Sequence, residues 1–458
     1  MSEKNKRKVK VGVLGAYRGT GMINYCKVAD NAELVAICDK YVPALEKQKQ
    51  ICGDNITYYT SFDEFIKHDM DAVILANYAN EHAPFALRCF EAGKHVFSEV
   101  IPCQNMKEAV ELVEAVEKSG LIYAFGENYC YMPAPYEMKK LYREGKIGEF
   151  EYAECEYLHN TESIWHSITY GQPEHWRNNV PSNFYCTHSL GPIIHITGLR
   201  PVSVIGIEGK HTERRFRTGA KCGSFGLEMV ELNNGGWVKS LHDGLYKNSV
   251  WYSVYGSHGR MESAREDALV GDVSRIYVNA DEYSGEYKDR PVESYEPHQF
   301  ADDKVAKNFG HGGSDFYCMY HFIEKILGNP DADIIDIYEA LDMGIVGLLA
   351  YRSVLNGGVP VRVPNLRNKE EREEYRNDIA CCDPNVAGDM LLPSFSKGNP
   401  EIAPEIYKEM ERRYLEEFEA DTGYVNAAFN QSSGNEIKDA NSDPTLTGAR
   451  QTVSEKEN

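Results

Sequence analysis

A tyrosine and a histidine three positions apart are the residues of this chain best suited to proton transfer. Tyr185 and His188 stand just before a helix that the sequence predicts to begin near Pro192. A neutral imidazole accepts a proton near pH 7, and a neighbouring phenol can handle a second one. Oxidation of an alcohol carbon needs such a base, because the hydroxyl loses a proton while the C–H bond loses hydride. The pattern also allows a structural interpretation, in which Tyr185 caps a core cluster and His188 is a satisfied buried residue.

Far upstream, a short strand and a glycine-rich turn indicate what would accept the hydride. Val9–Leu14 is an apolar strand, and the turn that starts at Gly15 leads into a helix whose N-terminal amides can approach a pyrophosphate. The match to Gly-x-Gly-x-x-Gly is imperfect, because Tyr17 occupies the middle glycine position. Asp39 ends the next strand, where a carboxylate binds ribose hydroxyls and repels a 2′-phosphate. The sequence predicts NAD rather than NADP, although the nearby cations leave that choice open.

Strand and helix signals alternate over residues 1–128, which we expect to form one domain. Further strands are predicted at 33–38, 71–76, 95–98 and 121–125, and helices at 81–92 and 106–119. The alternation predicts a doubly wound parallel sheet of the Rossmann type, whose ligands lie beyond the carboxyl ends of the strands. Asp39, Asn77, Glu99 and Asn128 fall at such ends.

The pattern changes after residue 128, and residues 129–365 are predicted as a substrate-binding α+β domain. Closely spaced strands are expected at 150–158, 202–208, 226–232, 236–241 and 250–255, and a helix at 315–327. Hairpin turns such as Asn233-Asn234-Gly235 favour a large, mostly antiparallel open sheet. Residues 266–310 look like a long excursion or lid. The remaining residues, 366–458, are predicted as an extension with a charged helix over 404–419 and a disordered tail beyond about residue 425.

Composition excludes several classes of protein. The formal net charge of −21 argues against general nucleic-acid binding, and no apolar run approaches the length of a membrane span. The polar N-terminus lacks a signal peptide, so we expect a cytoplasmic protein. Twelve scattered cysteines without a Cys-x-x-Cys pair are expected to be free thiols, with no metal site. An open sheet would leave an apolar face uncovered, which favours a homo-oligomer.

Three segments resemble one protein family. Residues 93–102 are similar to the Gly-Lys-His-Val-Leu-x-Glu-Lys-Pro segment of Gfo/Idh/MocA-type oxidoreductases. The chain most resembles the NAD-dependent glycosidases typified by α-N-acetylgalactosaminidase, which carry Glu-Val-Pro, Tyr-Pro-Thr-His and Gly-His-Gly-Gly-x-Asp. The corresponding residues here are Glu99-Val100-Ile101-Pro102, Tyr185-Cys186-Thr187-His188 and Gly310-His311-Gly312-Gly313-Ser314-Asp315. The chain departs from the pattern at Val100, which lacks the lysine of ordinary family dehydrogenases, at the extra Ile101, and at Cys186.

The motifs and the resemblance together give a set of candidate site residues. The cofactor-binding candidates are Gly15, Tyr17, Arg18, Gly19, Asp39, Asn77, Asn80, His82, Glu99, Val100 and Asn128. The substrate-binding candidates are Tyr157, His159, Trp176, Arg177, Thr187 and His311, beside the catalytic pair Tyr185 and His188. Tyr157 and His159 share one side of a strand, which faces either the pocket or the polar face of the sheet. Trp176-Arg177 offers an aromatic platform and a five-donor fork, or else an ordinary surface turn, and His311 stands in either a ligand site or a plain helix cap.

The resemblance implies chemistry on a hexopyranoside. Oxidation of ring carbon 3 acidifies the hydrogen on carbon 2, so that the substituent on carbon 1 can leave by elimination. Water then adds and the hydride returns, which gives hydrolysis without the two carboxylates of most glycosidases. One alternative is a sugar or inositol dehydrogenase that releases a keto product and NADH. Another is a non-catalytic NAD-linked sugar sensor.

Overall fold

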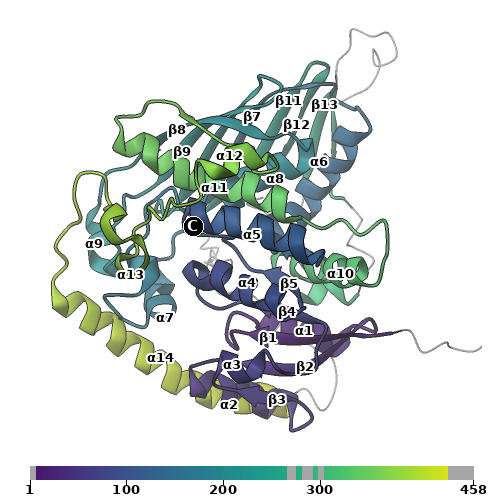
Figure 1. Cartoon of the computed structure of the whole chain (residues 1–458), viewed down its shortest axis with the longest axis vertical. Helices are drawn as coiled ribbons and strands as arrows, with labels where there is room; N and C mark the ends of the chain where they lie inside the picture. Colours follow the sequence, from purple (N-terminus) through teal and green to yellow (C-terminus); the bar gives the residue numbers. More distant parts are fainter. Residues whose placement is uncertain (1–6, 266–274, 281–291, 298–303, 432–458) are drawn as a thin grey trace, which may run out of the picture.

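A six-stranded parallel sheet forms the N-terminal part of the computed structural model, which describes residues 7–265, 275–280, 292–297 and 304–431. The strands lie in the order β3-β2-β1-β4-β5-β6 (Figure 1). They are β1 (Val9–Leu14), β2 (Ala32–Cys38), β3 (Thr57–Tyr59), β4 (Ala72–Leu75), β5 (His95–Ser98) and β6 (Tyr123–Phe125). The chain order changes direction at β1, which pairs with β2 on one side and β4 on the other. That switch opens the crevice in which such sheets bind ligands.

Helices from both parts of the chain pack around this sheet. Those of the first part are α1 (Thr20–Val28), α2 (Val42–Cys52), α3 (Phe62–Phe65), α4 (His82–Glu91) and α5 (Met106–Ser119). The later helix α10 (Ser314–Ile326) packs on α1, and the rings of Tyr25 and Phe316 are 5.0 Å apart between their centroids. The strands of a sheet covered on both sides are apolar throughout, as β4 is.

A nine-stranded sheet forms the second layer, in the order β14-β13-β12-β11-β7-β10-β9-β8-β15. The strands are β7 (Phe150–Leu158), β8 (Pro201–Glu208), β9 (Gly226–Leu232), β10 (Trp237–Asp243), β11 (Ser249–Gly256), β12 (Gly259–Ser263), β13 (Ile276–Ala280), β14 (Glu293–Tyr295) and β15 (Val361–Arg362). Among the described strands of this sheet, β10 and β7 alone pair in parallel. Three helices, α6 (Pro133–Arg143), α8 (Thr187–Thr197) and α11 (Ile337–Leu355), cover one face and lie between the two sheets (Figure 1). The fold class predicted from the sequence is confirmed.

Four segments of the structure differ from the elements predicted from the sequence. Helix α8 begins at Thr187, so the prediction of a helix starting near Pro192 is wrong; this proline lies inside the helix. Helix α11 was not predicted, because it is apolar on almost every side and shows no amphipathic period. Within 266–310, predicted as an excursion, β13 and β14 extend the edge of the sheet, while the rest of that lid prediction lies largely outside the described residues. The charged helix continues to residue 431, and the tail from 432 lies outside the described residues.

The remaining α-helices lie between strands of the second part of the chain and in the C-terminal segment. They are α7 (Trp165–Thr169), α9 (Glu213–Thr218), α12 (Lys369–Glu373), α13 (Pro384–Ala387) and α14 (Pro404–Gln431). In the C-terminal segment, α14 packs against α7 and α9. All twelve cysteines lie in the described part of the chain, and there each is a free thiol. No helix of the described residues is both long and apolar enough to cross a membrane.

Candidate active site

The glycine-rich turn after β1 has the shape of a phosphate cradle. Gly15 has a φ of 103°, and a Cβ atom there would lie 2.2 Å from the carbonyl oxygen of Ala76. Gly19 is the N-cap of α1, so the turn ends at a helix N-terminus. The Asp39 carboxylate accepts a hydrogen bond of 2.7 Å from the backbone N–H of Ala16. The turn therefore approaches the backbone after β4 closely and has the predicted acidic residue at its side.

Three asparagine side chains around the carboxyl ends of the strands present buried acceptors. The amide oxygens of Asn77, Asn80 and Asn128 are buried and have no hydrogen-bond partner among the described residues. The Nδ2 of Asn128 instead donates to Asp315 at 2.8 Å, so this amide is oriented. Buried acceptors need donors. The hydroxyls and carboxamide of a nicotinamide nucleotide are donors, and these residues therefore fit NAD.

An ion pair links the turn to the end of β5. Arg18 contacts the buried Glu99 carboxylate at 2.9 Å, and the other Glu99 oxygen accepts from the Val100 N–H at 3.4 Å. The exposed Tyr17 side chain precedes this arginine. The loop after β5 and the glycine-rich turn are thereby held together across the crevice.

His82 interacts with the backbone of two loops that border the crevice. Its Nδ1 lies 2.9 Å from the carbonyl oxygen of Ile101, and its Nε2 lies 3.3 Å from that of Asn77. Burial lowers the pKa of His82 to about 4, so the ring is neutral at pH 7. In the structure this residue acts on the loops through their backbone, and its direct contact with a cofactor stays a prediction.

His188 forms a buried pair with a carboxylate. Its Nδ1 lies 2.7 Å from Oε1 of Glu127, whose side chain is fully buried. A proton on Nδ1 that points at this carboxylate leaves Nε2 as the proton acceptor, as in hydrolase triads. The hydroxyl of Tyr252 donates to the His188 carbonyl oxygen at 2.6 Å and fixes the first turn of α8. Glu127 directly precedes Asn128 at the end of β6, but the sequence analysis did not select it.

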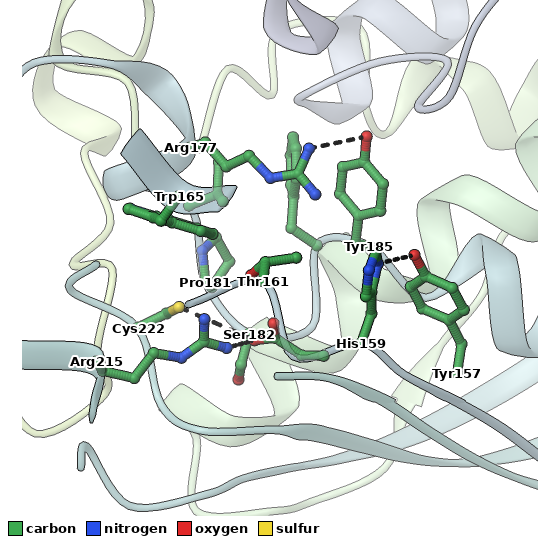
Figure 2. A pocket seen from close by; sticks show the side chains of 13 residues that line it. Tyr157, His159, Thr161, Trp165, Arg177, Pro181, Ser182, Tyr185, Arg215 and Cys222 are labelled. Carbon is green, nitrogen blue, oxygen red and sulfur yellow. Dashed lines mark hydrogen bonds and ion pairs between the residues drawn. The ribbon is translucent and has the colours of Figure 1, made fainter. Parts of the chain in front are cut away.

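Tyr185 joins the segment that precedes α8 to the loop after β5. Its hydroxyl lies 3.5 Å from the Val100 carbonyl oxygen. It also lies 3.5 Å from Nη1 of Arg177 (Figure 2). The guanidinium of Arg177 lies 4.6 Å above the phenol ring. The ring centroids of Tyr185 and His188 are 5.6 Å apart. The phenol and the imidazole are therefore neighbours on the side of the crevice where Glu99 and Val100 lie.

A second phenol and imidazole adjoin this pair. The hydroxyl of Tyr157 lies 2.8 Å from Nδ1 of His159, and the Tyr157 ring centroid is 4.6 Å from that of His188. Burial raises the pKa of Tyr157, so the phenol keeps its proton at neutral pH. Both side chains line a pocket (Figure 2). Of the two orientations that the sequence allowed, the structure has the one that faces the pocket.

The pocket extends from this pair towards α9. Its lining consists of Tyr157, His159, Thr161, Trp165, Arg177, Val180, Pro181, Ser182, Phe184, Tyr185, Arg215, Cys222 and Asp243. The buried Arg215 forms an ion pair with the half-buried Asp243 in the lining. These two residues come from α9 and the end of β10, and no spacing in the sequence could have connected them.

Three predicted substrate residues lie outside that lining. Trp176 stacks beside Tyr185, with 6.5 Å between ring centroids. Thr187 is fully buried in the first turn of α8, and its hydroxyl has no partner among the described residues. His311 lies at the cofactor side, with Nδ1 3.0 Å from Asp315. Although burial opposes it, His311 holds the pKa of Asp315 below the usual range. Asp315 ends the segment Gly310–Asp315, but it is not among the site residues predicted from the sequence.

Comparison with known proteins matches two family models to this chain. The model described as "Oxidoreductase family, NAD-binding Rossmann fold" of the Gfo/Idh/MocA type matches residues 9–127. The model "Glycosyl hydrolase 109, C-terminal domain" matches residues 209–371. Neither model reaches α13 or α14.

Individual proteins resemble the chain over most of its length. A glycosyl hydrolase family 109 protein from Solibacter usitatus is 27% identical, over 78% of this chain and 88% of that protein. An alpha-N-acetylgalactosaminidase from Shewanella oneidensis is 23% identical, over 78% of this chain and 84% of that protein. The crystal structure of an aldose-aldose oxidoreductase from Caulobacter crescentus has a TM-score of 0.62 at 20% identity, and the match covers 78% of this chain and 100% of that one.

The cofactor and the general class of protein follow from these matches. The cofactor is NAD. The first family model describes an NAD-binding domain, and the glycine-rich turn at Gly15 is consistent with it. The relatives are enzymes of sugar chemistry, and the protein is an NAD-dependent enzyme. The chain thus joins an NAD-binding domain of the Gfo/Idh/MocA oxidoreductase family to the C-terminal domain of glycosyl hydrolase family 109.

Proposed function

We propose that the protein hydrolyses a hexopyranoside through transient oxidation of ring carbon 3. The observation that carries this proposal is the contact of Tyr185 with the Val100 carbonyl, beside the buried pair of His188 and Glu127. This contact connects two proton-transfer groups to the crevice that binds the cofactor. The family 109 domain and the relative named alpha-N-acetylgalactosaminidase support a glycoside as substrate.

In the first step His188 removes a proton from the hydroxyl on carbon 3. Its Nε2 takes that proton, and the Glu127 carboxylate stabilises the imidazolium through the bond of 2.7 Å to Nδ1. NAD, when bound, accepts a hydride from a carbinol carbon and can return it. The sugar loses one proton and one hydride in this step, and carbon 3 becomes a ketone.

In the second step Tyr185 handles the proton on carbon 2, which the adjacent ketone acidifies. Arg177 donates towards the phenol oxygen and offsets negative charge on it. The proton from carbon 2 passes to Tyr185, and the substituent on carbon 1 takes up a proton and departs as the free alcohol, which leaves a double bond between the two carbons. Water then adds its hydroxyl to carbon 1 and a proton to carbon 2, hydride returns to carbon 3, and His188 gives its proton back to the oxygen on that carbon. One water is consumed, and the reaction as a whole involves no net oxidation.

Sugar recognition is assigned to the pocket that adjoins the pair. Tyr157 and His159 offer a hydroxyl and an imidazole, and Arg177 offers a planar set of donors for ring hydroxyls. Apolar lining from Trp165 and Phe184 suits the C–H faces of a pyranose. The proposal makes these residues the sugar-binding group.

A second candidate function is a dehydrogenase that releases a keto sugar and NADH. The likeness of fold to a myo-inositol 2-dehydrogenase from Lactobacillus plantarum, with a TM-score of 0.60 at 18% identity, favours it. The two functions differ in what becomes of the reducing equivalents. In a dehydrogenase, reduced cofactor appears in proportion to product, whereas in the proposed hydrolase it stays at catalytic levels.

An aryl glycoside assay on the purified protein distinguishes these functions. The phenol release and the absorbance of reduced cofactor are recorded together across a panel of aryl hexopyranosides of both anomers. We expect phenol release without accumulation of NADH, and loss of that activity in His188→Ala. Accumulation of NADH at the rate of sugar oxidation would instead identify the dehydrogenase. Glycoside turnover that His188→Ala leaves intact would contradict both functions and the catalytic role of this residue.

Three broader expectations stay predictions within this proposal. They are the division of the chain into residues 1–128, 129–365 and 366–458, a cytoplasmic location, and a homo-oligomer formed through the open face of the nine-stranded sheet. Light scattering measures the last of these.

A further inference from the structure

The C-terminal helix α14 connects the two parts of the enzyme. It lies outside both matched family models and extends from the region of α7 and α9 towards α2 (Figure 1). At its start, the hydroxyl of Tyr407 donates to the carbonyl oxygen of Gly219, which is the C-cap of α9. Farther along, the hydroxyl of Tyr414 bonds that of Tyr41 at 2.8 Å, and Tyr41 is the N-cap of α2.

The position of α14 against α7 is closely defined. A Cβ atom on Gly171, whose φ is 68°, would lie 2.3 Å from the backbone nitrogen of Glu411. The carboxylate of Glu417 lies 2.8 Å from Nε2 of His166 and 2.8 Å from the hydroxyl of Ser167. Only a glycine permits this approach of the helix backbone, so the contact is part of the fold.

Five aromatic side chains from four segments, one of them α14 itself, meet here, and we call them the aromatic wall. The ring of Tyr170 lies 4.9 Å from that of Tyr414, 6.3 Å from that of Tyr41 and 5.9 Å from that of His175. His175 in turn lies 4.8 Å from the ring of Tyr78. The wall thus combines side chains that follow β2 and β4 with side chains from the second part of the chain and from α14.

The wall begins at the carboxylate that is predicted to hold the adenosine ribose. One oxygen of Asp39 accepts from the Tyr41 N–H at 2.8 Å, while the other accepts from the glycine-rich turn. Lys40 lies 4.5 Å above the ring of Tyr78. Burial, and then the neighbouring Tyr78 and Asp39, raise the pKa of Tyr170, so its phenol is a neutral ring in this position. The adenine attached to a ribose at Asp39 would therefore reach these rings first.

We propose that the aromatic wall is the adenine subsite of the NAD site and that α14 completes it. Planar bases stack on phenol rings with useful energy and little entropy loss, because such rings have few rotatable bonds. Tyr78 and Tyr170 contact the base, and Tyr414 is a positioning residue that holds Tyr170 and Tyr41 from behind. This inference rests on NAD binding alone and not on the proposed hydrolysis.

Calorimetry with two fragments of the cofactor tests the subsite. ADP-ribose contains the adenosine and lacks only the nicotinamide ring, whereas nicotinamide mononucleotide lacks the adenosine. Tyr414→Ala is expected to weaken ADP-ribose binding about tenfold, because Tyr170 without its support no longer stacks on the base and about one stacking contact is lost, and to leave nicotinamide mononucleotide within about twofold. The matched control is Leu415→Ala on the same helix, whose side chain is 50% exposed and should leave both affinities unchanged.

Two further variants keep the test decisive if Tyr414→Ala does not fold. Tyr170→Ala removes a ring of the wall and should weaken ADP-ribose by a similar factor, and Tyr414→Phe removes only the bond to Tyr41 and should weaken it less. Thermal melting of the cofactor-free proteins establishes that each variant is folded. Unchanged ADP-ribose affinity in the folded variants, or an equal loss for nicotinamide mononucleotide, would overturn the subsite. Because the readout is binding, it is independent of any failure to find a hydrolysed glycoside.

Discussion

Replacement of Glu127 by glutamine is the most informative single change at the site. Glutamine has the shape of glutamate but no charge, so Glu127→Gln keeps an oxygen for Nδ1 of His188 and removes the counter-charge. Both side chains are buried, at 0% and 7% exposure, and the two atoms are 2.7 Å apart. The imidazolium that forms during proton abstraction would then lie in the protein interior without its anion.

The expected size of this effect follows from the type of bond. Hydrogen bonds to charged groups contribute about 1.5–3 kcal/mol, and short charge-assisted ones lie at the upper end. That range corresponds to a decrease in kcat of about 10–150-fold. The bond strengthens only as the imidazole becomes charged, so KM should change little.

The assay is steady-state cleavage of an aryl glycoside that the wild type accepts. Glu339→Gln is the matched control, because Glu339 also lies 2.7 Å from a histidine Nδ1, that of His195, away from the pocket. We expect kcat of this control to stay within about twofold of wild type. A Glu127→Gln enzyme with kcat within twofold of wild type would refute the reasoning. So would an equal loss in both variants, since the effect would then be general to buried pairs.

Three further predictions concern the cofactor crevice. The pKa of His82 is about 4 in the folded protein and about 6.5 in the unfolded chain, so the free energy of unfolding should rise with pH between these values. Denaturant unfolding should show that this free energy falls by roughly 1 kcal/mol from pH 7.5 to 5.5. The variant His82→Gln should not show this fall. An equal pH dependence in both proteins would contradict this assignment. Asp39→Ala should weaken NAD binding by about 1–3 kcal/mol in calorimetry, and unchanged affinity would place the ribose elsewhere. Gly15→Ala should abolish measurable NAD binding, because a Cβ atom at this position has no room. Gly21→Ala is the control and should bind NAD normally, because the space around Gly21 is open. Equal NAD binding by both variants would contradict a phosphate site at the glycine-rich turn.

The architecture was largely predictable from local patterns. Apolar runs that end in Asp39, Asn77, Glu99 and Asn128 predicted both the parallel sheet and the edge where ligands gather, because side-chain type and strand end are local properties. Helix α11 could not be predicted from its local pattern. It is buried on most sides, so its sequence has no periodic polar face. Pro192 predicts a helix start because proline favours the first turn of a helix, whereas in the structure it lies inside α8.

The sequence predicts only those parts of the site whose residues lie close together in the chain. Tyr185 and His188 stand out because they are close in the sequence. Glu127 is 61 residues from His188, and they form a pair because the segment that follows β6 packs against α8. The ion pair of Arg215 and Asp243 has the same origin, since it depends on how α9 meets the end of β10. Contacts of this kind are consequences of tertiary structure and leave no local pattern.

In the proposed mechanism a sugar carbon is oxidised only briefly while the glycosidic bond breaks. Proton NMR of the reaction in deuterated water, with a glycoside that the enzyme cleaves, detects this transient oxidation. We predict that the released sugar carries deuterium at carbon 2 and that reduced cofactor stays below the enzyme concentration. A cleaved sugar that retains its original hydrogen at carbon 2 would contradict the account, as would a keto product formed together with an equal amount of NADH.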